Sequence, residues 1–391
     1  MFFQTIRESD TQLIKILAIF PIGRQNEPKR ALVQAMTAML RKATISKANK
    51  ELQEAIDFYG ASMEIYSSSL YITAEMNCLA KFTEPVLDLL FEVLFEAKFD
   101  EDDWVTISNI LKENILQSQH QTDYWAERNL SLNLYGKDHI LGYYTNTRDY
   151  DDISISDIRS FYSTYLTNCC PKFFLAGELP KNTESYITSL VTKYKLADTK
   201  STYAPTTINS SGNYCSHKLE NASQASVRMA ISIQRTSFED FLKIEIWSMF
   251  LGGHYMSELM ILLRQKLGLT YGVHSHCVHH AHTSILHIGF DTDSKNVDIS
   301  LKKINNLFKR LNSENNLDLT DAINQYRSQY SRNSEKALTE ILYQVRLTRL
   351  GYDYSEYQKF MLGSDSTILN KMNNIQGRIF DFGQYNKSIA Y

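Results

Sequence analysis

An order of strands and helices that occurs twice is the feature that most constrains the fold. The first copy is predicted to hold a strand, two helices, a strand pair, two helices and a short central strand, at residues 12–21, 29–42, 48–58, 62–79, 84–97, 100–119 and 172–176. The second copy is predicted to hold a strand, a helix, a hairpin and two helices, at residues 227–233, 241–251, 271–278 with 284–291, 295–311 and 319–332. The remainder is expected to be helical, with a loop around Gly363. This duplication predicts an α+β protein with two similar domains, each a mostly antiparallel sheet packed with helices.

The polar stretch at residues 198–212, DTKSTYAPTTINSSG, is the predicted linker between the two copies. A chain of 391 residues is too long for one ordinary core, which also favours two domains. We therefore predict an N-terminal domain at residues 1–197 and a C-terminal domain at residues 213–391.

Charge and apolar patterning argue against several classes of partner. The chain has 41 basic and 44 acidic residues and no long basic run, so nucleic acid is not an expected partner. It has no apolar segment near the roughly 20 residues that a membrane helix needs, and its start does not resemble a signal peptide. Its five cysteines are odd in number and lack CxxC spacing, which predicts a reducing, cytoplasmic location.

The stretch at residues 250–273, FLGGHYMSELMILLRQKLGLTYGV, combines glycines with a short apolar repeat. It predicts the end of an apolar helix, a turn at Gly252 and Gly253, and a short amphipathic helix. A second turn is expected at Gly268, followed by a strand that starts near Tyr271. Arg264 would then lie near the helix end, so a cation and a phenol could converge beside a sheet edge. A plain helix–turn–strand corner, with a surface Arg264 and a half-buried Tyr271, is the alternative.

The run from Leu263 to Tyr271, LRQKLGLTY, resembles the C-terminal domain of the pitrilysin/insulinase-type zinc peptidases. These inverted zincins form the M16 family, whose motif here is a Gly-rich turn followed by an L-R-x-K-x-G-x-x-Y-like run. The duplicated layout is similar to that of the family, so the resemblance covers nearly the whole chain and implies the M16/LuxS-like metallopeptidase fold. It also implies that Arg264 and Tyr271, with the turn at Gly252 and Gly253, bind the substrate backbone near a metal.

The same family carries an inverted H-x-x-E-H motif on its first helix, in which two histidines ligate zinc and the glutamate activates water. The resemblance places Gln34 and Ala38 at the two histidine positions and Thr37 at the base. Glu113 falls at the spacing of the third ligand, a glutamate from the long helix. Thr106, seven residues earlier, stands where the family has a supporting glutamate.

These substitutions remove the chemistry of the site. Ala38 has no donor atom, and Gln34 offers only a neutral amide oxygen, which is a poor zinc ligand. Thr37 cannot act as a general base because its hydroxyl stays protonated at neutral pH. We therefore expect no metal here and no catalytic residue on this chain alone, and Glu113 is expected to be a solvated or hydrogen-bonded helix carboxylate.

A histidine-rich segment, HSHCVHHAH at residues 274–282, allows two interpretations. On a continuous strand, four histidines would share one face, and an HxH pair can bind zinc or copper; they are His274, His276, His280 and His282. A hairpin turn expected near residues 280–283 would divide this group, and Cys277 would point to the other face. A solvated hairpin is then the interpretation that the pattern favours.

Together the resemblance implies a non-catalytic subunit of a two-subunit M16-type metallopeptidase. A homologous partner with the H-x-x-E-H motif would hold the zinc, and this chain would contribute Arg264 and Tyr271 to the cleavage of unfolded peptides, including leader-peptide processing or general peptide clearance. A catalytically inert structural or peptide-binding member of the same fold is the alternative. A third possibility is a homodimeric metalloprotein that uses the histidine hairpin.

Overall fold

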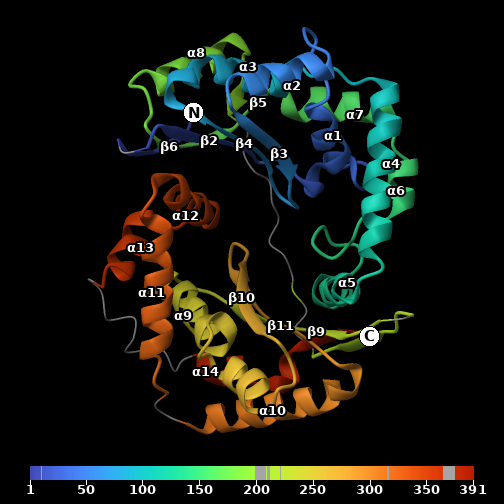
Figure 1. The fold of residues 1–391 in the computed structure, drawn as a ribbon, viewed down its shortest axis with the longest axis vertical. Helices are drawn as coiled ribbons and strands as arrows, with labels where there is room; N and C mark the ends of the chain where they lie inside the picture. Colours follow the sequence, from blue (N-terminus) through green and yellow to red (C-terminus); the bar gives the residue numbers. More distant parts are fainter. Residues whose placement is uncertain (10, 199–207, 209–211, 221, 315–316, 364–374) are drawn as a thin grey trace. The chain divides into compact units, whose positions relative to one another are not determined.

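The computed structural model describes the chain except for residues 10, 199–207, 209–211, 221, 315–316 and 364–374. The chain forms two compact units, each assembled from separate segments (Figure 1). The first unit comprises residues 1–116, 145–204 and 334–345, and the second comprises residues 117–144, 205–333 and 346–391.

These units differ from the predicted halves in two segments. Residues 117–144 group with the second unit and residues 334–345 with the first, so neither unit is continuous in sequence. The predicted domains at residues 1–197 and 213–391 describe two related halves of the sequence, and this division stays a prediction. The linker predicted at residues 198–212 lies almost wholly outside the described residues.

A five-stranded sheet forms the centre of the first unit, in the order β1-β6-β2-β4-β3. Its strands are β1 (Phe3–Arg7), β2 (Leu13–Phe20), β3 (Ser62–Ser67), β4 (Ile72–Leu79) and β6 (Lys172–Gly177). The β1–β6 pair is parallel and the other three pairs are antiparallel. The strands predicted at residues 12–21, 62–79 and 172–176 are confirmed, whereas the polar β1 was missed.

Both faces of β2 are covered, which explains its nearly continuous apolar run. Its even-numbered residues, including Ile14 and Ile16, belong to the main core beneath the helices. Leu17 and Ile19 point to the opposite face and pack with Ile341 of α12 (Ala337–Leu350). The helices of this unit are α1 (Leu32–Leu40), α2 (Asn49–Phe58), α3 (Thr83–Phe95), α4 (Glu101–Ser118), α6 (Thr147–Asp151), α7 (Ile155–Phe161) and α8 (Thr183–Lys193).

The second unit has its own five-stranded sheet, in the order β10-β11-β9-β12-β8. Its strands are β8 (Tyr214–His217), β9 (Ala225–Gln234), β10 (Val273–His279), β11 (Thr283–Thr292) and β12 (Asn386–Ala390). Only the β12–β8 pair is parallel. The two sheets therefore share one strand order, which confirms the predicted α+β architecture with mostly antiparallel sheets.

The expectation of an all-helical remainder is wrong for the last residues, which form β12 between β8 and β9. The sequence Asn-Lys-Ser-Ile-Ala hides this strand because three of its five residues are polar. All five are nevertheless buried, and the side chains of Asn386 and Lys387 are hydrogen-bonded. The side-chain oxygen of Asn386 accepts a hydrogen bond from the Asn213 amide, and the Lys387 ammonium donates to the carbonyls of Phe382 and Tyr385.

Helices of the second unit pack on both sides of this sheet. They are α5 (Thr122–Tyr135), α9 (Phe238–Ser248), α10 (Val297–Ser313), α11 (Thr320–Ser334), α13 (Tyr354–Met361) and α14 (Gln376–Ile379), and α12 is divided between the units after Val345. Leu130 and Leu134 of α5 pack against Ala230 of β9 and Ile285 of β11. Among the described residues, no helix has the length and apolar character that crossing a bilayer requires.

The turn predicted at Gly252 and Gly253 is wrong, because both residues continue α9 as a π-helical turn, η4 (Met249–Gly253). Close packing explains the glycines: a Cβ on Gly252 would lie 3.0 Å from the Ser275 amide of β10, and one on Gly253 would lie 2.7 Å from the Met249 sulfur. Gly268, in contrast, has a φ of +60° and forms the expected turn.

Gly177, at the end of β6, provides a test of this packing. Its φ is +105°, and a Cβ would lie 2.1 Å from the carbonyl oxygen of Leu13. We expect Gly177→Ala to lower the free energy of unfolding by more than about 2 kcal/mol, measured by urea denaturation followed by circular dichroism.

Gly60→Ala is the matched control, because Gly60 has a φ of +57° with no atom within 4 Å of the added Cβ. Gly60→Ala should lower the free energy of unfolding by only about 1 kcal/mol, which is the cost of a left-handed backbone conformation for alanine. Equal losses in the two variants would contradict the close approach of β6 and β2.

Candidate functional site

Helix α1 carries the positions that correspond to the zinc motif. Gln34 is exposed, Ala38 is half-buried and Thr37 is buried. The Thr37 hydroxyl lies 3.0 Å from each of the carbonyl oxygens of Val33 and Gln34, so it bonds back to its own helix. No group on this turn of the helix is positioned to ligate a cation or to take up a proton.

Two adjoining cavities lie over these positions, and we call them together the motif groove. Their volumes are about 640 and 310 Å³. The residues that line both are Thr37, Ala38, Ile65, Tyr66 and Leu111. Ile65 and Tyr66 belong to β3, which is the edge strand of the first sheet. The groove is therefore a concave surface beside a sheet edge. Glu64 and Glu27 line its two cavities, but among the described residues they belong to no group of three close metal ligands.

The sequence spacing pointed to Glu113 as the third-ligand position, and the structure places that residue elsewhere. Glu113 is exposed on α4 and is not among the lining residues, whereas Leu111, two residues earlier, lines both cavities. Residues two apart on a helix point about 200° from one another, so Glu113 faces away from the groove. Thr106 is also exposed, and its hydroxyl donates to the carbonyl of Asp102 at 3.0 Å.

Arg264 lies on the predicted short helix, which is a π-helical segment, η5 (Met260–Lys266). Its guanidinium carbon is 5.1 Å from the ring centroid of Tyr255, and the side chain is exposed. Stacking on an aromatic ring restrains the guanidinium while its N–H donors remain accessible.

Tyr271 lies in the turn before β10, which begins at Val273, two residues later than predicted. The side chain is 87% exposed. The turn is anchored because the Thr270 hydroxyl donates to the carbonyl of Asp291 at 2.6 Å and accepts from the Gly272 amide at 3.2 Å. Among the described residues, no hydrogen bond joins Tyr271 to Arg264, so both polar groups face solvent.

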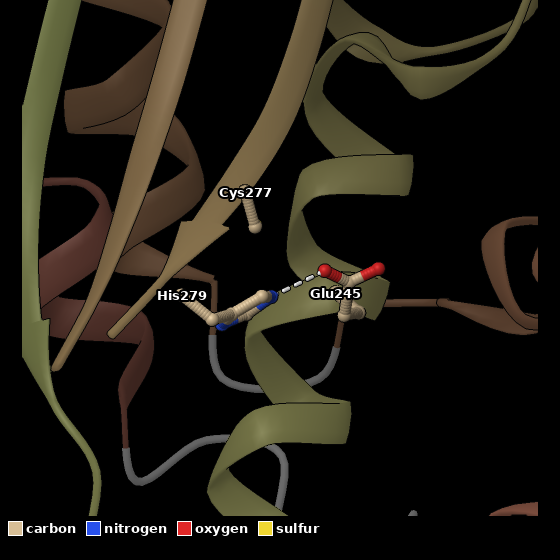
Figure 2. A group of neighbouring side chains, drawn as sticks. All are labelled: Glu245, Cys277 and His279. Atoms are coloured by element: carbon tan, nitrogen blue, oxygen red, sulfur yellow. Dashed lines mark hydrogen bonds and ion pairs between the residues drawn. The ribbon is translucent and has the colours of Figure 1, made fainter. Parts of the chain in front are cut away.

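A cluster of three potential metal ligands, which the sequence reasoning missed, lies between α9 and β10 (Figure 2). Glu245 comes from α9, and Cys277 and His279 come from β10, on the face opposite to His274 and His276. Their ligand atoms all lie within 4.8 Å of one another. The two-residue alternation along the strand could have revealed the Cys277–His279 pair.

The hydrogen bonds of this cluster argue against a metal. Nε2 of His279 lies 2.6 Å from Oε1 of Glu245, and Nδ1 lies 2.6 Å from the Ser284 hydroxyl. The Arg346 guanidinium donates to the same Glu245 oxygen at 2.5 Å. Both imidazole nitrogens and one carboxylate oxygen, Oε1, are therefore already used.

The protonation states lead to the same conclusion. Burial by itself would raise the pKa of Glu245, but the charge of Arg346 and the bond from His279 outweigh it and lower the pKa to about 2. Burial raises the pKa of the Cys277 thiol and lowers the pKa of His279. At neutral pH, a carboxylate and a guanidinium thus cancel beside a neutral thiol and imidazole, and a divalent cation would leave net charge in a buried place. The cluster is an ion-pair network that joins α9, β10 and α12.

The predicted face of four histidines is divided by the expected turn. β10 ends at His279, and His282 lies beyond it as an exposed residue. Nε2 of His280 lies 3.0 Å from the hydroxyl of Tyr135 on α5. His274 and His276 remain on one face, and His287 of β11 lies directly opposite His276.

Comparisons with known proteins agree with this fold and site. The family model of the peptidase M16 inactive domain matches residues 152–326. A curated relative, the uncharacterized zinc protease YmxG of Bacillus subtilis, is 23% identical over 247 residues. That match covers 61% of this chain and 58% of the relative's length.

Two solved structures share the fold over nearly the whole chain. A peptidase M16 inactive domain from Pseudomonas fluorescens superposes with a TM-score of 0.87 at 18% identity, covering 99% of this chain and 94% of that one. A protease from Helicobacter pylori superposes with a TM-score of 0.82 at 12% identity, covering 99% and 96%. The chain therefore has the fold of these M16 proteins, and its residues 152–326 match the model of the M16 inactive domain. The positions on α1 that the resemblance assigns to the zinc motif carry Gln34, Thr37 and Ala38.

The Glu245 network predicts a loss of stability in acid. The pKa of Glu245 is about 2 in the folded chain, below its ordinary value of 4.5. Its contribution is therefore fully present above pH 4.5 and is lost as the pH falls toward 2. We expect this to lower the free energy of unfolding by roughly 3 kcal/mol in total. Urea denaturation at a series of pH values measures it.

Glu245→Gln removes one group that takes up a proton on unfolding between pH 4.5 and 2. In that range, the slope of the unfolding free energy against pH should therefore fall by about 1.4 kcal/mol per pH unit. Glu356→Gln, at an exposed glutamate of α13, is the matched control and should leave the slope unchanged. If the two variants had the same profile, Glu245 would not be the buried ion-pair partner described here.

Proposed function

We propose that this chain is the non-catalytic subunit of a two-subunit M16-type metallopeptidase. Its partner would be a homologous chain with the H-x-x-E-H motif and the zinc ion. The proposal is supported by a contrast between the positions that the family resemblance assigns to substrate binding and those that it assigns to zinc. Arg264 and Tyr271 are exposed and anchored, whereas Gln34, Thr37 and Ala38 supply no metal ligand.

The two side chains suit the binding of an extended peptide. A guanidinium that stacks on Tyr255 keeps several N–H donors for backbone carbonyl oxygens. A phenol that is 87% exposed can donate to the oxygen on which negative charge develops during attack at the partner's zinc. On this proposal, the zinc and the water-activating glutamate come from the partner, because Gln34, Thr37 and Ala38 of α1 supply neither.

The substrate class follows from the same arrangement. Recognition through backbone carbonyls suits unfolded peptides, in which those groups are not already paired. Leader-peptide processing and general peptide clearance both fit this chemistry. The relation to a protein named as a zinc protease supports a role in proteolysis. All five cysteines are free thiols, which supports a reducing, cytoplasmic location.

The test is peptide cleavage by the assembled pair, with variants on this chain. Arg264→Ala or Tyr271→Phe should each lower kcat/KM by a factor of about 100 to 1,000, because loss of one donor to a developing oxyanion has that effect. Size-exclusion chromatography should show that both variants still assemble with the partner.

Matched controls come from the same unit. Lys302→Ala removes an exposed cation from α10, and Tyr214→Phe removes the hydroxyl of an exposed tyrosine on β8. Both should cleave at the wild-type rate. Wild-type cleavage by the Arg264 and Tyr271 variants would exclude the shared site.

The second candidate is a catalytically inert, peptide-binding member of the fold, and the motif groove favours it. A cavity of about 640 Å³ lies beside β3, and an added strand could pair with this sheet edge and place its side chains in the cavity. On this account, peptide would bind to the chain alone, and the Arg264 and Tyr271 variants would not affect cleavage by any partner.

A further inference from the structure

Three histidines lie together on the face of the second sheet on which α5 packs. His274 and His276 come from β10 and His287 comes from β11, and we call them the histidine triad. In the antiparallel register, His276 lies directly opposite His287, and His274 lies opposite Gly289. Because side chains alternate along a strand, all three imidazoles extend from the same face.

The spacing of the rings suits a single metal ion. The centroids of His276 and His287 are 4.9 Å apart, and those of His274 and His276 are 6.0 Å apart. A tetrahedral zinc ion bound at 2.0–2.1 Å from each nitrogen places the centroids of two imidazole ligands about 5 Å apart. The rings are nearly parallel, at 10° and 18°, and their nitrogens do not already form a close ligand group, so rotation about side-chain bonds is needed to direct them to one point.

Gly289 makes room for the first of these rings. A Cβ at this position would lie 2.3 Å from Nε2 of His274, and 3.1 Å from Cδ of Arg228. Any other residue would push the His274 ring away from β11. The lack of a side chain at Gly289 therefore helps to place His274 beside His276 and His287.

Charges around the histidine triad favour a cation. Arg228 of β9 is the nearest basic group, and it bonds to two carboxylates. Its Nε donates to Oε1 of Glu127 on α5 at 2.9 Å, and its Nη1 donates to Oδ1 of Asp291 at 3.0 Å. The three groups together carry one negative charge, next to imidazoles that carry none when neutral.

We propose that His274, His276 and His287 bind one divalent transition-metal ion of the zinc class, with water at the remaining coordination position. His274 and His276 are exposed, so the ion would be open to solvent and to an exogenous ligand. This site is separate from the zinc-motif positions of α1 and does not depend on the proposed function. Imidazole nitrogens also accept Cu²⁺, which should bind more tightly than Zn²⁺.

Titration of the metal-free chain with Zn²⁺ in a calorimeter tests the site, and Co²⁺ absorption reports its geometry. We expect one ion per chain and the visible absorption bands of tetrahedral Co²⁺. Loss of a side chain that only supports a ligand weakens metal binding by up to about 100-fold. His276→Ala removes a ligand itself, so it should weaken Zn²⁺ binding by more than that. His276 is exposed, so this variant should fold.

Gly289→Ala is a second variant that leaves all three ligands in the sequence. It should weaken Zn²⁺ binding because the new methyl group displaces His274. His282→Ala, at an exposed histidine of the same hairpin beyond the turn, is the matched control and should bind as the wild type does.

Three results would overturn the proposal. One is the absence of stoichiometric Zn²⁺ binding to the wild-type chain. Another is equal affinity in the wild type and in His276→Ala. The third is a loss of binding in Cys277→Ser with none in His276→Ala, which would assign the ion to the cluster on the other face of β10.

Discussion

In each five-stranded sheet, the strand that comes last in the sequence lies between the two strands that come first, and it pairs with both. β6 lies between β1 and β2, and β12 lies between β8 and β9. In the second sheet, the central position is filled by the last residues of the chain, Asn386–Ala390. Backbone groups of β8 and β9 would lose their ladder partners without it, and such groups are costly to leave unpaired once buried. The strands that carry the candidate sites, β3 and β10, take equivalent edge positions in the two sheets.

The two edge strands border different chemistry. β3 borders a groove over a helix whose side chains have no metal ligands, and there the hydroxyl of Thr37 bonds to its own backbone. β10 has a buried ion pair, Glu245 with Arg346, against one face and a set of neutral histidines on the other. Tyr271 precedes the same strand and is almost fully exposed. The polar groups available to other molecules on the second unit are therefore gathered around the start of β10.

The sequence predicted most elements because their apolar patterns are strong, and it failed where the pattern was weak or polar. β12 was missed because Asn386, Lys387 and Ser388 are polar, and tertiary hydrogen bonds compensate the burial of Asn386 and Lys387. The two glycines of η4 were misassigned, since glycine signals close packing as well as turns. At the motif, residue spacing alone pointed to Glu113, whereas the helical face that lines the groove includes Leu111.

The identities at α1 were the most informative part of the sequence. Ala38 has no donor atom and Gln34 offers only a neutral amide oxygen, and neither fact depends on packing. The Glu245 network could not be foreseen, since it joins α9, β10 and α12 from three distant parts of the chain. His287 was missed for the same reason: its relation to His276 is set by strand register, which periodicity within one strand does not report.

Cleavage of an unfolded peptide by this chain alone, by an H-x-x-E-H partner alone and by the two together tests the central claim most directly. The account predicts no cleavage by this chain, and cleavage by the mixture that far exceeds that of the partner alone. Cleavage by this chain alone would contradict it, because the zinc-motif positions on α1 hold no group that binds zinc or activates water.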